Sequence, residues 1–279
     1  MVANLKNTIL VPTDFSEACS NSATQAIDAA RLLNYKVVLL HVINSESLAY
    51  LQSENLSVNH IDLRLKALAL NLMHLGGINV EYLSREGSIF TTISEVASEI
   101  GANLIYLGTH GKTGIQRFIG SFALKVVISS PVPVVVVQKR PFDKGYKDII
   151  LPVTSETGPW EKAKWAVYIA KQFNAAIHIL LIGDAGEKVK DTANQIATHL
   201  EQNKVSYSYK ESEKHSQFAQ QTIDHATSNN ADLIMIMTDP DKGFINFILN
   251  SFDEEIIFNT SQIPVMCVNP RKLNYEFIA

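Results

Sequence analysis

Residues 7–14 read NTILVPTD, and residues 148–155 read DIILPVTS. Each stretch is a short apolar run that ends in polar residues. Each is followed by a helix-like segment and a second apolar run, VVLLHV at 37–42 and AIHILLI at 176–182. Further on, NLIYLGTHGKTG and GSFALKVV in the first half correspond to DLIMIMTDPDKG and NSFDEEII in the second. A repeat of about 140 residues indicates two similar domains, because the repeats of a solenoid are much shorter.

Strand and helix patterns alternate through both halves. The first half predicts strands at about 7–12, 37–42, 80–84, 104–108 and 131–137, and helices at about 20–34, 60–75, 88–100 and 121–130. Residues 44–60 are polar and are expected to form an irregular excursion. The second half predicts strands near 148–153, 176–182, 204–210, 232–237 and 264–269, and helices near 160–173, 187–201, 215–229 and 251–259. This alternation predicts an α/β fold of two open parallel sheets, each covered by helices on both faces.

The segment QKRPFDKGYK at 138–147 is polar and contains proline and glycine, so it is interpreted as the linker. We therefore assign residues 1–140 to an N-terminal domain and residues 146–279 to a C-terminal domain. The tail, residues 270–279, is expected to be a surface strap or disordered.

Composition narrows the class of protein. The 279-residue chain has a net charge of −4 and a pI near 6.1, so we expect no nucleic-acid partner. Its N-terminus lacks the apolar core of a signal peptide, and no apolar run reaches membrane-spanning length. Cys19 and Cys267 lie in different halves without metal-ligand spacing. These features predict a cytoplasmic protein with no membrane association and no metal site.

The candidate site lies where the strands of the first half end, because ligands of open α/β sheets bind beyond the carboxyl ends of the strands. Glycines there let backbone N–H groups approach an anion, and a helix expected to start at Ser121 adds its own free N–H groups. The carboxylate of Asp14 suits a ribose hydroxyl or an adenine amino group. A glycine-rich loop is by itself equally typical of a plain turn. The candidate nucleotide-binding residues are Pro12, Thr13, Asp14, Val42, Leu107, Gly108, His110, Gly111, Gly120, Ser121 and Phe122.

Other polar residues near these strand ends favour no catalytic machinery. His41 and His110 are interpreted as polar lining of the cleft, with a phosphate contact open to His110. Lys112 and Arg117 could neutralise phosphate, or they could simply be solvated. Spacing alone suggests no Ser-His-Asp relay, no Cys-His relay and no catalytic pair of carboxylates.

Several of these segments together resemble the universal stress protein family. They are VPTDFSE after the first strand, LLHV in the second, GTHGKTG followed by GS after the fourth, and SSPVPVVVV at the fifth. The resemblance covers the whole first half and the second half in outline, so the chain is similar to a tandem universal stress protein. It implies an adenine-nucleotide alpha-hydrolase-like fold with strand order 3-2-1-4-5 in each half. It also implies that the two domains pair through their last strands.

The resemblance further implies a nucleotide motif, Gly-x2-Gly-x9-Gly-Ser/Thr. Here it falls on Gly108, Gly111, Gly120 and Ser121, with eight residues instead of nine in the longer spacer. We expect this difference to affect the contacts with the phosphates more than those with the adenine. In the family the aspartate after the first strand contacts the adenosine and a residue ending the second strand lies against the base. Those roles fall to Asp14 and Val42, while Pro12, Thr13 and Leu107 would add backbone or packing contacts.

The second half departs from this pattern. Thr154 stands at the place of Asp14, and the three glycines are replaced by Met237, Pro240 and Asn250. Proline has no N–H to offer, and side chains occupy the approach path. We therefore expect the second half not to bind nucleotide in the same way.

Three functions follow in order of preference. The first is a stress-response sensor or regulator that binds ATP or another adenine nucleotide, with or without Mg. The second is a nucleotide-free interaction module that binds a protein partner or another small ligand. The third is a slow, Mg-dependent ATPase. The stress role comes wholly from the resemblance, and self-association beyond the intrachain pair of domains is left open.

Overall fold

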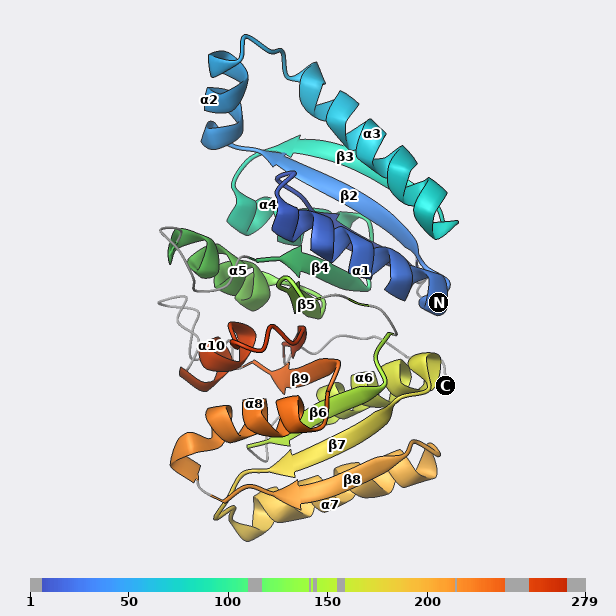
Figure 1. Ribbon diagram of the computed structural model, residues 1–279, viewed down its shortest axis with the longest axis vertical. Coiled ribbons are helices and arrows are strands. Elements are labelled where there is room, and N and C mark those ends of the chain that lie inside the picture. Colours follow the sequence, from blue (N-terminus) through green and yellow to red (C-terminus); the bar gives the residue numbers. More distant parts are fainter. Residues whose placement is uncertain are drawn as a thin grey trace.

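The computed structural model describes residues 7–109, 117–140, 142, 145–154, 159–213, 215–238 and 251–269. Ten strands form one sheet in the order β3-β2-β1-β4-β5-β10-β9-β6-β7-β8 (Figure 1). Each half therefore has the strand order 3-2-1-4-5, which confirms the expected topology. The two halves meet at the centre of the sheet, so only β3 and β8 are edge strands of this sheet among the described residues.

In the first half the elements are β1 (Thr8–Pro12), α1 (Glu17–Leu33), β2 (Lys36–Ile43), α2 (Ser45–Ser53), α3 (Asn59–Gly76), β3 (Val80–Glu86), α4 (Ile89–Glu99), β4 (Leu104–Gly108), α5 (Arg117–Ser129) and β5 (Val134–Val137). In the second half they are β6 (Asp148–Val153), α6 (Pro159–Phe173), β7 (Ala176–Leu181), α7 (Glu187–Gln202), β8 (Tyr207–Glu211), η1 (His215–Gln217), α8 (Phe218–Ser228), β9 (Leu233–Met237), α10 (Ser251–Ile257) and β10 (Val265–Val268). None of the helices in the described part of the chain is long and apolar enough to cross a membrane.

Helix starts account for two differences from the sequence prediction. Helix α1 begins at Glu17, three residues early, because the Ser16 hydroxyl accepts a hydrogen bond from the Cys19 N–H and caps the first turn. The predicted irregular excursion is wrong, because it contains helix α2. Its N-cap is Asn44, whose side chain accepts from the Ser47 N–H at 2.9 Å. The predicted end of α3 is confirmed, because Gly77 has the left-handed conformation that ends this helix.

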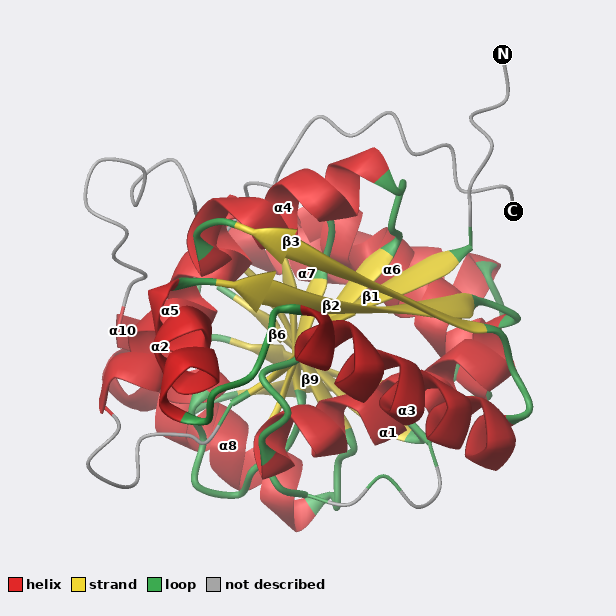
Figure 2. Ribbon diagram, turned by 90° about the horizontal axis from the view of Figure 1, so that it is seen from above, coloured by secondary structure: helices red, strands yellow, loops and turns green. Residues whose placement is uncertain are grey.

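Helices cover both faces of the sheet, as Figure 2 shows from above. Alternate residues along each strand point to opposite faces, so two apolar layers form. One layer packs against α1, α3, α6 and α7, and the other against α4, α5, α8 and α10. The strands between them are almost wholly apolar, as parallel strands buried on both faces must be.

The halves join through their last strands. Strands β5 and β10 pair antiparallel, with Val135 opposite Met266. The two residues that follow these strands then exchange contacts across the seam. The Gln138 side chain donates to the carbonyl of Asn259, just past α10, at 3.1 Å. The Asn269 side chain donates to the carbonyl of Val127, in the last turn of α5, at 2.7 Å. Each half thus satisfies carbonyls at the end of the other half's last helix.

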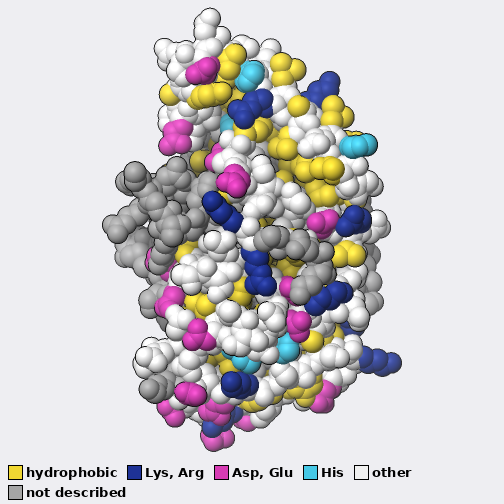
Figure 3. Space-filling model, viewed as in Figure 1, with side chains coloured by type: hydrophobic (Ala, Val, Ile, Leu, Met, Phe, Trp, Pro, Cys, Tyr) yellow, Lys and Arg dark blue, Asp and Glu magenta, His cyan; other side chains and the backbone are white. Residues whose placement is uncertain are grey.

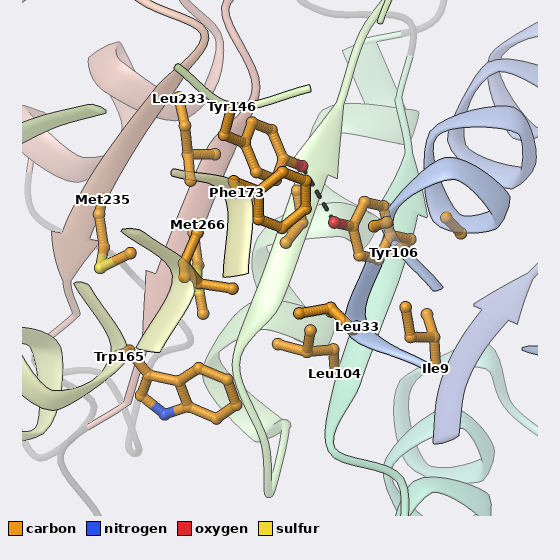
Figure 4. Close-up of a cluster of buried hydrophobic side chains, with 14 of the residues drawn as sticks. Ile9, Leu33, Leu104, Tyr106, Tyr146, Trp165, Phe173, Leu233, Met235 and Met266 are labelled. Carbon is orange, nitrogen blue, oxygen red and sulfur yellow. Dashed lines mark hydrogen bonds between the residues drawn. The ribbon is translucent and has the colours of Figure 1, made fainter. Parts of the chain in front are cut away.

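The linker forms a second connection between the two halves. Its sequence is mostly polar, but it contains a buried tyrosine. Tyr146 is fully buried, and its hydroxyl lies 3.0 Å from the hydroxyl of Tyr106 in β4 (Figure 4). The Tyr146 ring also packs on Phe173 of α6, with ring centroids 4.8 Å apart. One linker residue therefore fills the space between the two halves and touches both.

Removing one of the two buried hydroxyls should cost more than removing both. Tyr106→Phe or Tyr146→Phe leaves a buried hydroxyl without its partner, so each should lower the free energy of unfolding by about 1–3 kcal/mol. The double variant should be clearly more stable than the sum of the single effects predicts. Urea denaturation of the four proteins measures this coupling, and strictly additive effects would contradict the assigned hydrogen bond.

Candidate functional site

A cavity of about 530 Å³ lies at the carboxyl ends of β1, β2 and β4. Parallel strands end at the same edge of a sheet, so residues about 110 positions apart in the sequence meet there. Helices α2 and α3 contribute to one part of its wall, and α4 and α5 contribute to another. The cavity brings together seven of the predicted residues: Pro12, Thr13, Asp14, Val42, Leu107, Gly108 and Phe122. His110 and Gly111 lie outside the described residues.

One wall of the cavity is apolar. Val42 and Leu107 come from the strand ends and belong to the layer of the sheet that faces α4 and α5. Ile93 of α4 and Phe122 of α5 extend this wall, and the Phe122 ring stacks on Phe90 at 5.2 Å. A flat apolar surface of this kind suits the face of a nucleobase. Sequence reasoning did not select Ile93, because a core residue of a helix looks the same whether or not a cavity lies beside it.

Asp14 brings a negative charge to the cavity, whose lining also includes Glu46. The Ser16 N–H donates to its carboxylate at 2.8 Å. Burial raises the pKa of Asp14, but hydrogen bonds from Ser16 and Cys19 outweigh it, so the pKa lies below its ordinary value. Burial, together with the Asp14 charge, raises the pKa of the Cys19 thiol to about 12, so the thiol remains a hydrogen-bond donor. Asp14 is therefore ionised at neutral pH and available as an acceptor.

His41 ties the strand ends to helix α2. Its Nδ1 lies 2.8 Å from the carbonyl oxygen of Thr13, and its Nε2 lies 3.0 Å from the hydroxyl of Ser47. Burial lowers the pKa of His41, which the Thr13 carbonyl and the Asp14 charge offset only in part. The imidazole is therefore neutral at pH 7, with Nδ1–H donating to Thr13 and Nε2 accepting from Ser47. His41 lines the cavity as predicted.

Arg64 of α3 supplies a positive charge beside the cavity. Its guanidinium carbon lies 4.0 Å from the centre of the Phe15 ring, which in turn stacks on His41 at 5.0 Å. Phe15 has a left-handed backbone (φ 66°), which turns its ring toward this stack. A guanidinium in this position can bind a phosphate group. Sequence reasoning missed Arg64, Phe15 and Ser47, although Asn44 is of a residue type that commonly caps the start of a helix.

The sequence predicts that the helix after the glycine-rich loop starts at Ser121, and this prediction is wrong. Helix α5 begins at Arg117, so Gly120 and Ser121 lie within it and Ser121 does not cap it. A glycine inside a helix costs only about 1 kcal/mol relative to alanine, which packing of α5 against α4 can offset. The free N–H groups of the helix end therefore lie about one turn earlier than expected. Among the described residues, no group of three or more His, Cys, Asp or Glu is placed to hold a metal ion.

The second half carries two charged side chains at positions that hold small residues in the first half. Lys162 in α6 stands at the position of Ser22 in α1, counted back from the equivalent left-handed residues Asn174 and Asn34. Asp253 in α10 stands at the position of the cavity-lining residue Ala123.

Both charged side chains are buried, and the Lys162 ammonium donates to the carbonyl of Pro152 at the end of β6. Pro152 is the counterpart of Pro12, because the two residues hold the same register in their sheets. Burial lowers the pKa of Lys162 to about 8, while the nearby charge of Asp253 raises it. A charged side chain thus stands where Ala123 lines the cavity of the first half, and a second one stands where the first half has the buried Ser22.

Gly108 is required by packing as well as by any ligand. A Cβ atom at this position would lie 2.4 Å from the carbonyl oxygen of Ala18 in α1. Gly108→Ala should therefore push α1 away from β4 and lower the free energy of unfolding by about 1–3 kcal/mol. Thermal denaturation checks this. A fully stable Gly108→Ala variant would show that α1 does not approach β4 this closely.

Lys162 should make stability depend on pH. In the unfolded chain its pKa is 10.5, so between pH 8 and 10.5 the unfolded chain binds more protons than the folded one. The free energy of unfolding then rises with pH. Between pH 7.5 and 9.5 the wild-type protein should gain about 2 kcal/mol relative to Lys162→Met. Urea denaturation at several pH values measures the two curves, and parallel curves would show that Lys162 is not buried as a charge.

Comparison with known proteins finds relatives of the first half of the chain. The model of the universal stress protein family matches residues 6–138. Universal stress protein MJ0531 of Methanocaldococcus jannaschii is 32% identical over 144 residues, which cover 49% of this chain and 84% of the relative. A universal stress protein solved in complex with cAMP is 22% identical, covers 49% of this chain and all of its own, and has a TM-score of 0.40.

The whole chain also has a structural counterpart. The crystal structure of a universal stress protein from Archaeoglobus fulgidus aligns with a TM-score of 0.77. The alignment covers 95% of this chain and 99% of that one at 18% identity. At this identity it speaks for the fold, including both halves of the sheet. On the match of the first half, this chain belongs to the universal stress protein family.

Proposed function

We propose that the cavity in the first half binds ATP or a related adenine nucleotide and that the protein acts as a stress-response sensor or regulator. The observation that carries the proposal is the cavity itself. It lies at the strand ends where α/β sheets hold ligands, and it combines an apolar wall with an ionised Asp14. The stress role rests on membership of the family alone.

Each part of a nucleotide has a partner in this arrangement. The base would lie against the wall formed by Val42, Ile93 and Phe122, and Asp14 would accept a hydrogen bond from a ribose hydroxyl. The phosphates would lie toward the N-terminus of α5, where backbone N–H groups and the helix dipole favour negative charge. Arg64, which lines the cavity, can partly neutralise the negative charge of a phosphate group.

The two halves are therefore proposed to have unequal roles. A nucleotide in the second half would need the space beside Lys162 and Asp253. Displacing these side chains would separate buried charged groups from the groups that stabilise them. We expect one nucleotide per chain, held in the first half.

The nucleotide content of freshly purified protein tests the proposal. Denatured protein would be separated from its small molecules and the supernatant analysed by ion-exchange chromatography. We expect about one adenine nucleotide per chain in the wild type. Asp14→Ala should lose it or bind added ATP at least about tenfold more weakly, since a charged hydrogen bond is worth about 1.5–3 kcal/mol. Thr154→Ala, the matched change in the second half, should bind as the wild type does.

Other outcomes favour the alternatives. A wild-type protein without nucleotide and without a thermal shift in ATP, AMP or cAMP would contradict the proposal and favour an interaction module for a protein partner. Steady phosphate release with Mg would instead favour a slow ATPase. Equal loss of binding in Asp14→Ala and Thr154→Ala would place the nucleotide elsewhere in the chain.

A further inference from the structure

Three polar side chains form a hydrogen-bonded chain across the second half of the sheet. Asp148 opens β6, His178 lies early in β7, and Ser208 lies early in β8. His178 is opposite Ser208 in the register of the two strands. Its Nδ1 lies 2.8 Å from the Ser208 hydroxyl, and its Nε2 lies 2.9 Å from a carboxylate oxygen of Asp148. The three residues are 30 positions apart in sequence at each step, so spacing gives no hint of them.

The two contacts of His178 decide where its proton lies. A carboxylate only accepts hydrogen bonds, so Nε2 carries the proton and donates it to Asp148. In the neutral form of the imidazole, Nδ1 then accepts the hydrogen bond from the Ser208 hydroxyl. This arrangement has a nucleophile, a general base within hydrogen-bond reach and a third group that orients the base. Here it uses the two ring nitrogens in the opposite sense to the serine proteases, with the nucleophile on Nδ1.

Ser208 is accessible because β8 is an edge strand and the Ser208 side chain is exposed. In the ladder to β7, Ser206 accepts from the Ile177 N–H, and the Ser212 N–H donates to Leu181. The even-numbered residues of β8 therefore face β7. Alternate residues of a strand direct their N–H groups to opposite sides, so the Tyr209 N–H points off the edge of the sheet. It directly follows Ser208 and can donate to an oxyanion formed there.

Helix α8 covers this face of the sheet and carries a second histidine, His225. The Asn229 side-chain amide lies 3.2 Å from Nδ1 of His225 and donates to it, so a neutral His225 carries its proton on Nε2. That Nε2 is buried and has no hydrogen-bond partner among the described residues. Burial lowers the pKa of His225, and the charge of Lys210 lowers it further. Figure 3 shows charged side chains of both signs and histidine side chains interspersed over the visible face of the molecule.

We infer that Ser208 is an activated nucleophile that accepts acyl groups from small activated carboxylic esters. Its oxygen forms a bond to the acyl carbon while the bond from that carbon to the leaving oxygen breaks. The hydroxyl proton passes to Nδ1 of His178 and from there to the leaving alkoxide. Water then hydrolyses the acyl-serine and releases the acid. Asp148 acts as a positioning residue that holds the imidazole.

This site is separate from the nucleotide cavity. It lies at the amino ends of the strands in the second half, whereas the cavity lies at the carboxyl ends in the first. The inference does not depend on nucleotide binding, and each can fail without the other.

A fluorophosphonate probe tests the inference, because it forms a stable bond from phosphorus to the serine oxygen and releases fluoride. The full-length protein would be treated with the probe and the labelled residue identified by peptide mass spectrometry. We expect label at Ser208 that is absent from Ser208→Ala and at least about tenfold slower in His178→Gln. The same variants should lose the hydrolysis of p-nitrophenyl acetate in parallel.

Two further variants separate chemistry from structure. Ser206→Ala removes an exposed serine of the same segment for which no histidine contact is assigned, and it should label at the wild-type rate. Asp148→Asn should slow labelling, and Asp148→Glu should restore part of it, since the carboxylate acts through its hydrogen bond. Thermal denaturation of each variant confirms that it is folded. No label at Ser208, or label that does not depend on His178, would overturn the inference.

Discussion

The antiparallel pairing of β5 with β10 is the constraint on which the rest of the structure depends. Strand β5 reads VVVV and strand β10 reads VMCV. In each half alone this apolar strand would have one unpaired edge, and such edges tend to pair with other chains. Pairing the two edges within one chain satisfies their backbone groups. It also sets Val135 against Met266, its own counterpart, so the two halves are related by a near-twofold axis at this point.

The side chains beyond these strands make the pairing specific. Gln138 and Asn269 each donate a side-chain hydrogen bond to a carbonyl of the other half. The pairing therefore cannot slip by one residue without breaking both sets of contacts. Tyr146 fills the remaining space between the halves (Figure 4). Because these contacts lie at the junction of the two halves, the side chains at the carboxyl edge of each half can differ without disturbing the pairing.

That freedom explains how two halves of the same topology carry different surfaces. Ala123 lines the cavity of the first half, whereas Asp253 takes the equivalent place in the second, and Lys162 replaces the buried Ser22. The polar chain of Asp148, His178 and Ser208 has likewise no counterpart among the aligned residues of the first half, where Thr8 and Val38 hold the first two places. Side chains on a common backbone, not the fold, thus decide what each half can do.

The sequence by itself determined the two-part α/β organisation, the strand order through the family resemblance, and most of the cavity residues that end strands. These follow from local periodicity and from the rule that parallel strands end at one edge of a sheet. It did not reveal α2 or the true start of α5, because polar residues and an internal glycine weaken a local helix signal.

Only the tertiary structure decided which side chains meet across elements. The stack of Arg64 on Phe15, the burial of Lys162 beside Asp253, and the link from Asp148 through His178 to Ser208 all join residues far apart in the chain. No spacing pattern encodes such contacts, because they depend on the register of neighbouring strands and on how closely helices pack on them. Chemistry at a site is set by these distances, and distances between elements exist only once the chain is folded.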